Sequence, residues 1–363
     1  MMMRVGTIAA GAVMAIAASN AAYAGGIERT TQSAMLLFAQ GNRVELSYGH
    51  VNPELTGTTV DTASVPNVAD SFNLPSIGLK MDVTDRVALA LIYDKPFGAD
   101  ILYDPSNIVL GGTIAEAETT ALTALAKFKI NENVSVFGGL RFQKAEGEIT
   151  LSGAAYGVAS GYNVKLEENW ATGYVVGAAY EIPEIAFRLA LTYNSAIEHD
   201  FDTKENIAPG VTSTTNVKTP QSVNLEFQTG IAEDTLLMAS VRWAEHSAFR
   251  IKPTAFGRDL VSLEDTTTYT LGVARRFTPK FAASISVAYE APGKELVSPL
   301  SPRTGLTAVT LGGSYKVSEQ VEISGGISHI WFGDAMPQTA GTARGDFTDN
   351  TATAFGLKVA YSF

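Results

Sequence analysis

The chain has no cysteine among its 363 residues, which excludes disulfide bridges, thiol nucleophiles and cysteine-based zinc sites. Basic residues are also scarce: 26 Lys and Arg stand against 37 Asp and Glu, and a net charge of −11 does not suit nucleic acid as a partner. The four histidines are widely scattered and show no metal-ligand spacing. Because no Ser–His or paired-carboxylate motif is present either, the sequence predicts no metal, no cofactor and no catalysis.

Long apolar runs are missing too, except at the start of the chain. Arg4 supplies a positive charge, residues 5–18 are apolar and rich in alanine, and Ala22-Tyr23-Ala24 fits a small-x-small cleavage site. About fourteen apolar residues are too few to cross a hydrocarbon core of roughly 30 Å as a helix. Residues 1–24 are therefore predicted to be a cleaved signal peptide, and the exported mature chain is expected to begin at Gly25.

What dominates the rest of the sequence is alternation with a period of two residues. Near the end of the chain, apolar side chains occupy every second position, namely Phe355, Leu357, Val359, Tyr361 and Phe363. The same pattern recurs over 134–143, 185–194 and 237–244, each time with an arginine on the less apolar face. Such alternation is typical of strands with one apolar face, in a soluble sandwich or in a membrane barrel.

The number of strands and the lengths of their connections favour the barrel. Fourteen candidate strands are predicted, at 43–52, 70–83, 86–96, 116–130, 133–150, 164–182, 184–200, 216–231, 234–250, 265–278, 280–290, 305–317, 320–332 and 351–363. Six tight turns alternate with seven longer loops, an asymmetry that is typical of outer-membrane barrels, as is an even strand number. The aromatic end at Phe363 fits the same class. We therefore expect an all-β fold, a 14-stranded antiparallel transmembrane β-barrel over residues 43–363, which forms a monomer in the bacterial outer membrane.

Residues 25–42 do not alternate and begin like a short helix after Thr30 or Thr31. About eighteen residues are too few to fold alone, so the segment either dangles in the periplasm or packs inside the barrel. The apolar run Met35-Leu36-Leu37-Phe38 favours packing, and a fourteen-stranded ring has a bore wider than its own side chains fill. The sequence therefore predicts that residues 25–42 form a small N-terminal hatch, or plug, in the lumen.

Several short motifs occur in a characteristic order around these strands. They are a Gly-containing N-terminal hatch, Pro96-Phe97-Gly98 after the third strand, Thr219-Pro220-Gln221-Ser222 at the eighth, Leu311-Gly312-Gly313-Ser314-Tyr315, and the closing Gly356–Phe363. This layout resembles the FadL-type family of outer-membrane transporters for long-chain fatty acids and other hydrophobic compounds, over nearly the whole mature chain. Two departures concern the substrate: the family's Asn-Pro-Ala triplet is replaced by Phe38-Ala39-Gln40-Gly41-Asn42, and the chain is shorter than typical members.

The resemblance implies passive diffusion of a hydrophobic, fatty-acid-like ligand through a plugged barrel, with lateral exit into the membrane. Other implied partners are outer-membrane lipid and the barrel-insertion machinery. The ligand-binding hatch residues would be Met35, Leu36, Leu37 and Phe38. The lateral gate would be Asp94, Pro96, Phe97 and Gly98, where proline lacks the N–H that a sheet ladder needs; alternatively, Pro96 simply ends the strand.

Inward-facing cations offer a second kind of candidate site. Arg141, Arg188 and Arg242 could contact a ligand carboxylate, as could Lys127 and Lys358, or these side chains could form structural ion pairs with Glu226 and Glu322. Two other functions remain open: a general diffusion porin for small polar solutes, which would lack a plug, and a surface receptor or adhesin that uses the long loops. An outer-membrane lipase would need a Ser–His pair that the sequence does not display.

Overall fold

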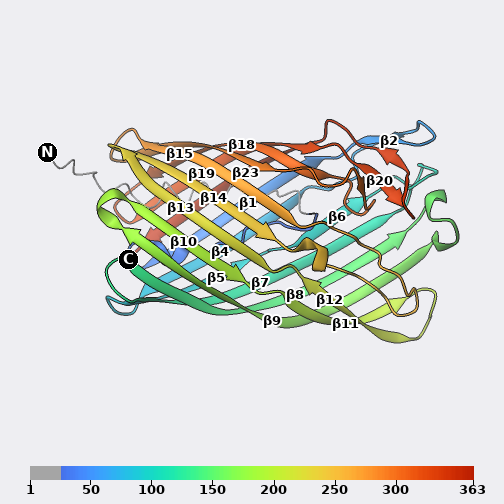
Figure 1. Ribbon diagram of the computed structural model, residues 1–363, viewed down its shortest axis with the longest axis horizontal. Helices are drawn as coiled ribbons and strands as arrows, with labels where there is room; N and C mark the ends of the chain where they lie inside the picture. Colours follow the sequence, from blue (N-terminus) through green and yellow to red (C-terminus); the bar gives the residue numbers. More distant parts are fainter. Residues whose placement is uncertain (1–25) are drawn as a thin grey trace.

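The computed structural model describes residues 26–363, so the predicted signal peptide lies outside the described residues. Long tilted strands form a single closed barrel (Figure 1). The wall strands are β1 (Arg43–Glu54), β4 (Phe72–Asp82), β5 (Val87–Asp94), β6 (Gly98–Leu102), β7 (Ile114–Lys129), β8 (Val134–Leu151), β9 (Tyr162–Ile182), β10 (Phe187–Asn194), β11 (Ile197–Glu205), β12 (Thr212–Thr219), β13 (Ser222–Ala232), β14 (Thr235–Ala244), β15 (Thr266–Arg276), β16 (Phe281–Glu290), β18 (Thr304–Lys316), β19 (Val321–Gly333) and β23 (Thr351–Ser362).

The ring closes because β1 pairs antiparallel with β23, from Arg43↔Ser362 to Glu54↔Thr351. A closed sheet leaves no edge whose backbone groups would lack partners in hydrocarbon. Three wall strands are interrupted, into β5 and β6, β10 and β11, and β12 and β13, so the described wall has fourteen strands and confirms the prediction. The break between β12 and β13 falls at Pro220, which has no N–H for the ladder.

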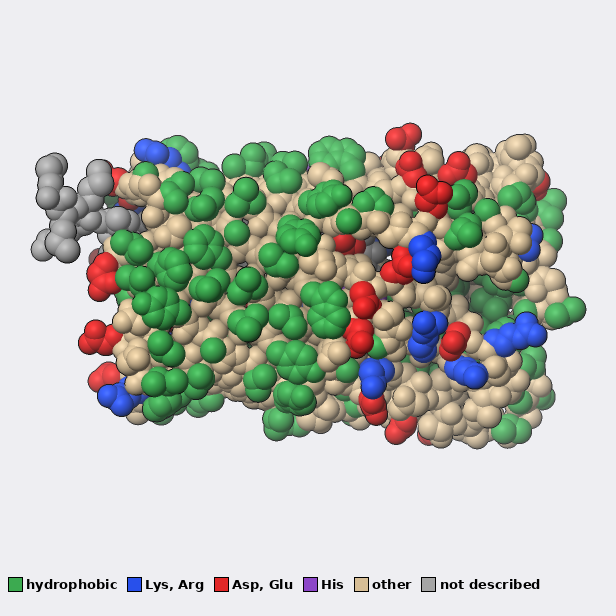
Figure 2. Space-filling view, viewed as in Figure 1, with side chains coloured by type: hydrophobic (Ala, Val, Ile, Leu, Met, Phe, Trp, Pro, Cys, Tyr) green, Lys and Arg blue, Asp and Glu red, His purple; other side chains and the backbone are tan. Residues whose placement is uncertain are grey.

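The two faces of each strand differ as the alternation predicts. In β23, Phe355 and Leu357 point outward and are about half exposed, whereas Lys358 and Ala360, on the other face of the strand, are buried. Figure 2 shows hydrophobic side chains covering the left and middle parts of the visible outer face. Lys, Arg, Asp and Glu gather toward the right and at the left rim. This arrangement is typical of a barrel whose apolar band faces lipid tails.

The connections differ in length between the two ends of the barrel. Tight turns join β4 to β5, β7 to β8, β15 to β16 and β18 to β19 at the end where the C-terminus lies (Figure 1). The opposite end carries the longer loops, with the short strands β2 (Gly57–Thr59), β3 (Ser64–Val65), β17 (Leu296–Val297), β20 (Met336–Thr339), β21 (Thr342–Ala343) and β22 (Gly345–Asp346). Four short 3-10 helices complete the structure, η1 (Met35–Phe38), η2 (Ala154–Ala159), η3 (Pro183–Ile185) and η4 (His246–Ala248). Among residues 26–363, no helix is long and apolar enough to cross a membrane.

Candidate functional site

Residues 26–42, called the inner segment below, lie inside the barrel. The segment is tied to strands on different sides of the ring: the Thr30 hydroxyl donates to Asp94 on β5 (2.8 Å), and the Ser33 hydroxyl donates to Glu226 on β13 (2.8 Å). The Asn224 amide on β13 donates to the carbonyl of Thr31 (2.9 Å). Because these partners point inward from opposite parts of the wall, the segment occupies the lumen rather than the periplasm.

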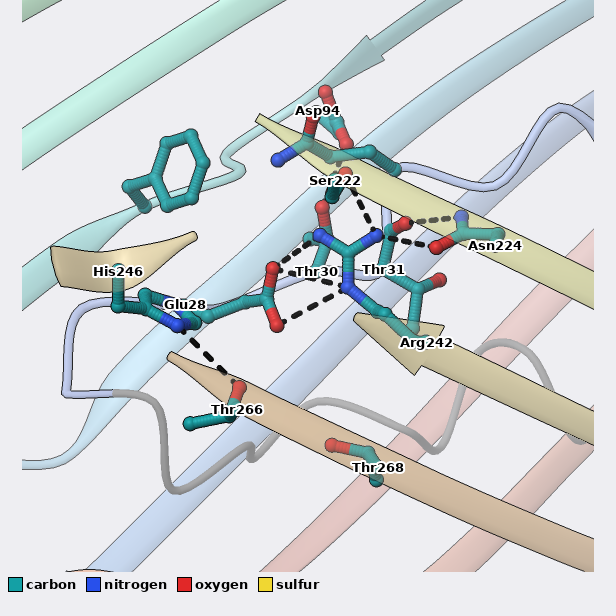
Figure 3. A network of polar contacts seen from close by, with 12 residues as sticks. Glu28, Thr30, Thr31, Asp94, Ser222, Asn224, Arg242, His246, Thr266 and Thr268 are labelled. Atoms are coloured by element: carbon teal, nitrogen blue, oxygen red, sulfur yellow. Dashed lines mark hydrogen bonds and ion pairs between the residues drawn. The ribbon is translucent and has the colours of Figure 1, made fainter. Parts of the chain in front are cut away.

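A buried ion pair between Glu28 and Arg242 is the strongest polar anchor of the inner segment (Figure 3). The Glu28 carboxylate accepts from the Arg242 guanidinium of β14, and the two side chains are only 1% and 5% exposed. Arg242 also donates to the Ser222 hydroxyl (3.1 Å) and to the Asn224 amide oxygen. Buried charges need both a counter-charge and hydrogen bonds, and this arrangement supplies both.

The apolar run of the segment forms η1 and packs into the core. Leu37 is fully buried, and the Phe38 ring meets Phe137 edge to face at 5.7 Å between centroids. The Lys127 ammonium lies 4.3 Å from the centre of the Phe38 ring, where a cation–π contact is favourable. Of the four predicted ligand-binding residues, Met35 and Leu36 line a cavity in the lumen, whereas the contacts of the other two are with the barrel wall.

The predicted gate residues lie at the interruption of the third wall strand, between β5 and β6. Here the backbone turns to the inner segment: the Arg29 N–H donates to the Pro96 carbonyl (2.9 Å), and the Gly98 N–H donates to the Ile27 carbonyl (2.8 Å). The Phe97 N–H donates instead to the hydroxyl of Thr119 on β7 (2.9 Å). Pro96 therefore does more than end the strand. The strand resumes at Gly98, and the residues of the interruption contact the inner segment.

The interruption leaves a gap in the barrel wall. β4 pairs with β5 only from Ile77↔Tyr93 to Asp82↔Ala88, while residues 72–76 pair with β1 alone. β6 pairs with β7 on one side. On its other side, among the described residues, it has no ladder with β4, only the bridge Ala69↔Ile101 and, next to it, the bridge Glu28↔Phe97 to the inner segment. We call the unpaired stretch between residues 72–76 and 94–99 the lateral gap.

Three hollows meet at the lateral gap. An apolar cavity of about 70 Å³ lies in the loop-side half of the lumen, lined by residues that include Phe97, Phe201, Val217, Ile251 and Leu300. An outer groove of about 360 Å³ runs along the gap and shares Phe97 with the apolar cavity. A lumen cavity of about 170 Å³ lies between the inner segment and strands β1, β4 and β5, and shares Arg29 with the outer groove.

The three arginines predicted to contact a carboxylate are all engaged with other groups. Arg242 binds Glu28, as described; Arg141 donates to the Thr123 hydroxyl (2.9 Å) and to the Gln32 amide of the inner segment. Arg188 donates to the Gln228 amide (2.7 Å) on β13. Their observed contacts therefore hold the inner segment and the wall together.

The sequence analysis did not single out several residues that shape the site. Glu28 and Arg29 of the inner segment and Asp100 of β6 were missed, as was the loop between β14 and β15, which supplies Ile251 to the apolar cavity. A signal for the first two was present, because adjacent charges in an otherwise uncharged lumen segment require inward-facing partners.

A closed fourteen-stranded barrel with an apolar outer band, a segment inside its lumen and a gap in its wall is a plugged membrane channel. The family model described as outer membrane protein transport protein (OMPP1/FadL/TodX) matches residues 5–363, and the chain belongs to that family. Membership confirms the predicted outer-membrane location and the predicted class, transport of hydrophobic molecules.

Solved structures support the fold. A Pseudomonas aeruginosa FadL homologue is 18% identical with a TM-score of 0.72, and the alignment covers 91% of this chain and 92% of that chain. The P. putida toluene transporter TodX is 14% identical with a TM-score of 0.65, covering 91% and 92%. The Ralstonia pickettii toluene transporter TbuX is 14% identical with a TM-score of 0.61, covering 89% of both chains. No curated protein sequence matches the chain.

Proposed function

We propose that the chain carries small uncharged hydrophobic molecules across the outer membrane, through the apolar cavity and out sideways through the lateral gap. The observation that carries this proposal is the continuity of the two hollows at Phe97, which lines both the apolar cavity and the outer groove. The process is diffusion down a gradient and involves no catalysis. Transfer of about 200 Å² of aromatic surface from water to such a cavity gains roughly 5 kcal/mol, which is enough for capture.

The composition of the apolar cavity favours a neutral ligand over an ionised fatty acid. Among the described residues that line it, none is Lys or Arg. A carboxylate buried there would lack a counter-charge, which carries a large desolvation cost. The three arginines named from the sequence already bind Glu28, Gln32 and Gln228. The two lysines also have partners, because Lys358 pairs with Glu45 (3.5 Å) and Lys127 lies over the Phe38 ring. The toluene transporters TodX and TbuX are relatives of this fold with an uncharged substrate.

Lateral exit suits such a ligand because the polar inner segment lies across the direct route through the lumen to the periplasm. The inner segment crosses the lumen and is held there by ion pairs and hydrogen bonds, whereas the gap leads from the apolar cavity to the outer groove on the outside of the barrel. A general porin would lack such a segment, and its steady ionic conductance would distinguish it. We propose the gate residues Asp94, Pro96, Phe97 and Gly98 as the rim of this exit.

The test is uptake of radiolabelled toluene and of ionised laurate by liposomes that contain the mature protein. Ile251→Asp places a charge in the apolar cavity from a loop, and we expect it to reduce toluene uptake at least tenfold. Ile108→Asp is the matched control, because Ile108 is 74% exposed on another loop. The expected preference is toluene over laurate. Equal uptake by both variants, or faster uptake of laurate than toluene, would contradict the proposal.

A further inference from the structure

Arg29 is the only residue that lines both the lumen cavity and the outer groove, among the described residues around these two hollows. Its backbone belongs to the inner segment and is held by the Pro96 carbonyl. Its side chain extends into the lateral gap and is 10% exposed. The guanidinium therefore lies at the boundary between the inside and the outside of the barrel.

Contacts from both sides of the gap hold this guanidinium. On one side it lies over the Phe72 ring of β4, 3.7 Å from the ring centre. On the other side it forms an ion pair with Asp100 of β6. In this part of the wall, where strands β4 and β6 share no ladder, the Arg29 side chain connects the two strands.

Gly98 makes room for the arginine. A Cβ atom at this position would lie 2.3 Å from the Nε atom of Arg29 and 3.0 Å from the Ala117 carbonyl oxygen. The glycine is needed here for close approach of another group, a role that glycine commonly has within strands. Any side chain at position 98 would displace the guanidinium from the gap.

The Arg29 guanidinium does not use all of its hydrogen-bond donors. Its Nε atom is buried and has no hydrogen-bond partner among the described residues. Burial lowers the pKa of Arg29, while the neighbouring Asp100 carboxylate raises it. Because Asp100 is 38% exposed, its carboxylate stays in contact with water when the ion pair opens, and the guanidinium can follow it toward the outer groove.

We infer that Arg29 is a removable closure of the lateral gap, which must leave Phe72 and Asp100 before a hydrophobic molecule can pass from the lumen to the lipid. This inference rests on the proposed lateral exit and names the residue that controls it. The closed position is stabilised by one cation–π contact and one partly exposed ion pair. Loss of both contacts is expected to open the gap about tenfold more often.

The test measures access to the gap directly, without transport. Because the chain has no cysteine, Ala117→Cys adds a single thiol beside the gap, on a residue that lines both the outer groove and the apolar cavity. The protein is reconstituted in lipid and treated with a lipid-soluble maleimide. We expect Arg29→Ala to raise the labelling rate about tenfold, and Gly98→Ala to raise it as well because it expels the guanidinium.

Arg43→Ala is the matched control for loss of a buried ion pair. The Arg43 side chain is also 10% exposed and binds Glu45 (2.7 Å) at the opposite end of the lumen, so its loss should leave labelling unchanged. Folding of each variant is checked by whether the barrel stays folded in SDS when the sample is not heated. Unchanged labelling in folded Arg29→Ala and Gly98→Ala proteins, or equal gains in Arg43→Ala, would overturn the inference.

Toluene uptake by the same variants separates the two proposals. Faster labelling with faster uptake supports both the closure and the lateral exit. Faster labelling with unchanged uptake supports the closure and contradicts lateral exit as the route of transport. Unchanged labelling contradicts the closure, whatever the uptake.

Discussion

Replacement of Glu28 by glutamine should loosen the inner segment without changing its shape. The substitution removes the carboxylate that forms the ion pair with Arg242 and leaves the hydrogen bonds of that guanidinium to the Ser222 hydroxyl and the Asn224 amide in place. Breaking a buried ion pair by neutralising one partner costs about 3–5 kcal/mol, because the other charge stays buried without that counter-charge. At about 1.4 kcal/mol per factor of ten, the displaced state of the segment should become roughly 10² to 4 × 10³ times more populated.

Single-channel recording in planar bilayers measures this change, since a displaced segment opens an ionic path through the lumen. Glu28→Gln should show frequent openings, and Glu132→Gln, in an exposed turn, should behave like the natural protein. The double variant Glu28→Leu with Arg242→Met should restore closure, because an apolar pair of similar size can replace a buried ion pair. The reasoning fails if the single variant opens no more often than the natural protein.

Three further predictions concern the barrel, its loops and pH. Leu271→Arg on the lipid-facing side should lower the free energy of unfolding by about 2–4 kcal/mol in lipid, and Thr267→Arg near the strand end by about 0–1 kcal/mol, as measured by urea titration. Tyr103→Phe removes a buried hydrogen bond to the Pro299 carbonyl (2.9 Å) and should speed proteolysis of the loops, with a loss of about 1 kcal/mol. Burial lowers the pKa of His246, so the unfolded chain binds a proton more readily and the free energy of unfolding should fall as the pH drops below about 6.5. His246→Gln should weaken this pH dependence, and an unchanged pH profile in that variant would contradict the prediction.

The fold could be predicted because each strand of a membrane barrel has a local sequence pattern, an alternation of lipid-facing and lumen-facing side chains. Every second residue of β23 faces lipid, and this local pattern needs no knowledge of distant contacts. The predicted strands at 133–150 and 320–332 differ from β8 and β19 by one residue at each end. The prediction missed that the third wall strand resumes after Pro96 and runs to Leu102, because a proline normally ends a strand.

The site was harder to predict because its contacts join residues far apart in the chain. Glu28 meets Arg242 across 214 positions, and Tyr103 meets Pro299 across 196. The alternation correctly placed Arg141 and Arg242 on the inner face but could not show what each would bind. The gate segment was found by resemblance, and its role stays a prediction until the gap is tested.

The length of β9 has a consequence for where capture takes place. Its 21 residues, at about 3.3 Å each and a tilt of about 40°, rise about 50 Å, roughly twice the height of an apolar band of about 25 Å. The part of the apolar cavity near Leu166, at the loop end of this strand, therefore lies above the hydrocarbon, at the level of the hydrated head groups. On the proposed route, a hydrophobic solute would cross this hydrated layer inside the projecting part of the barrel.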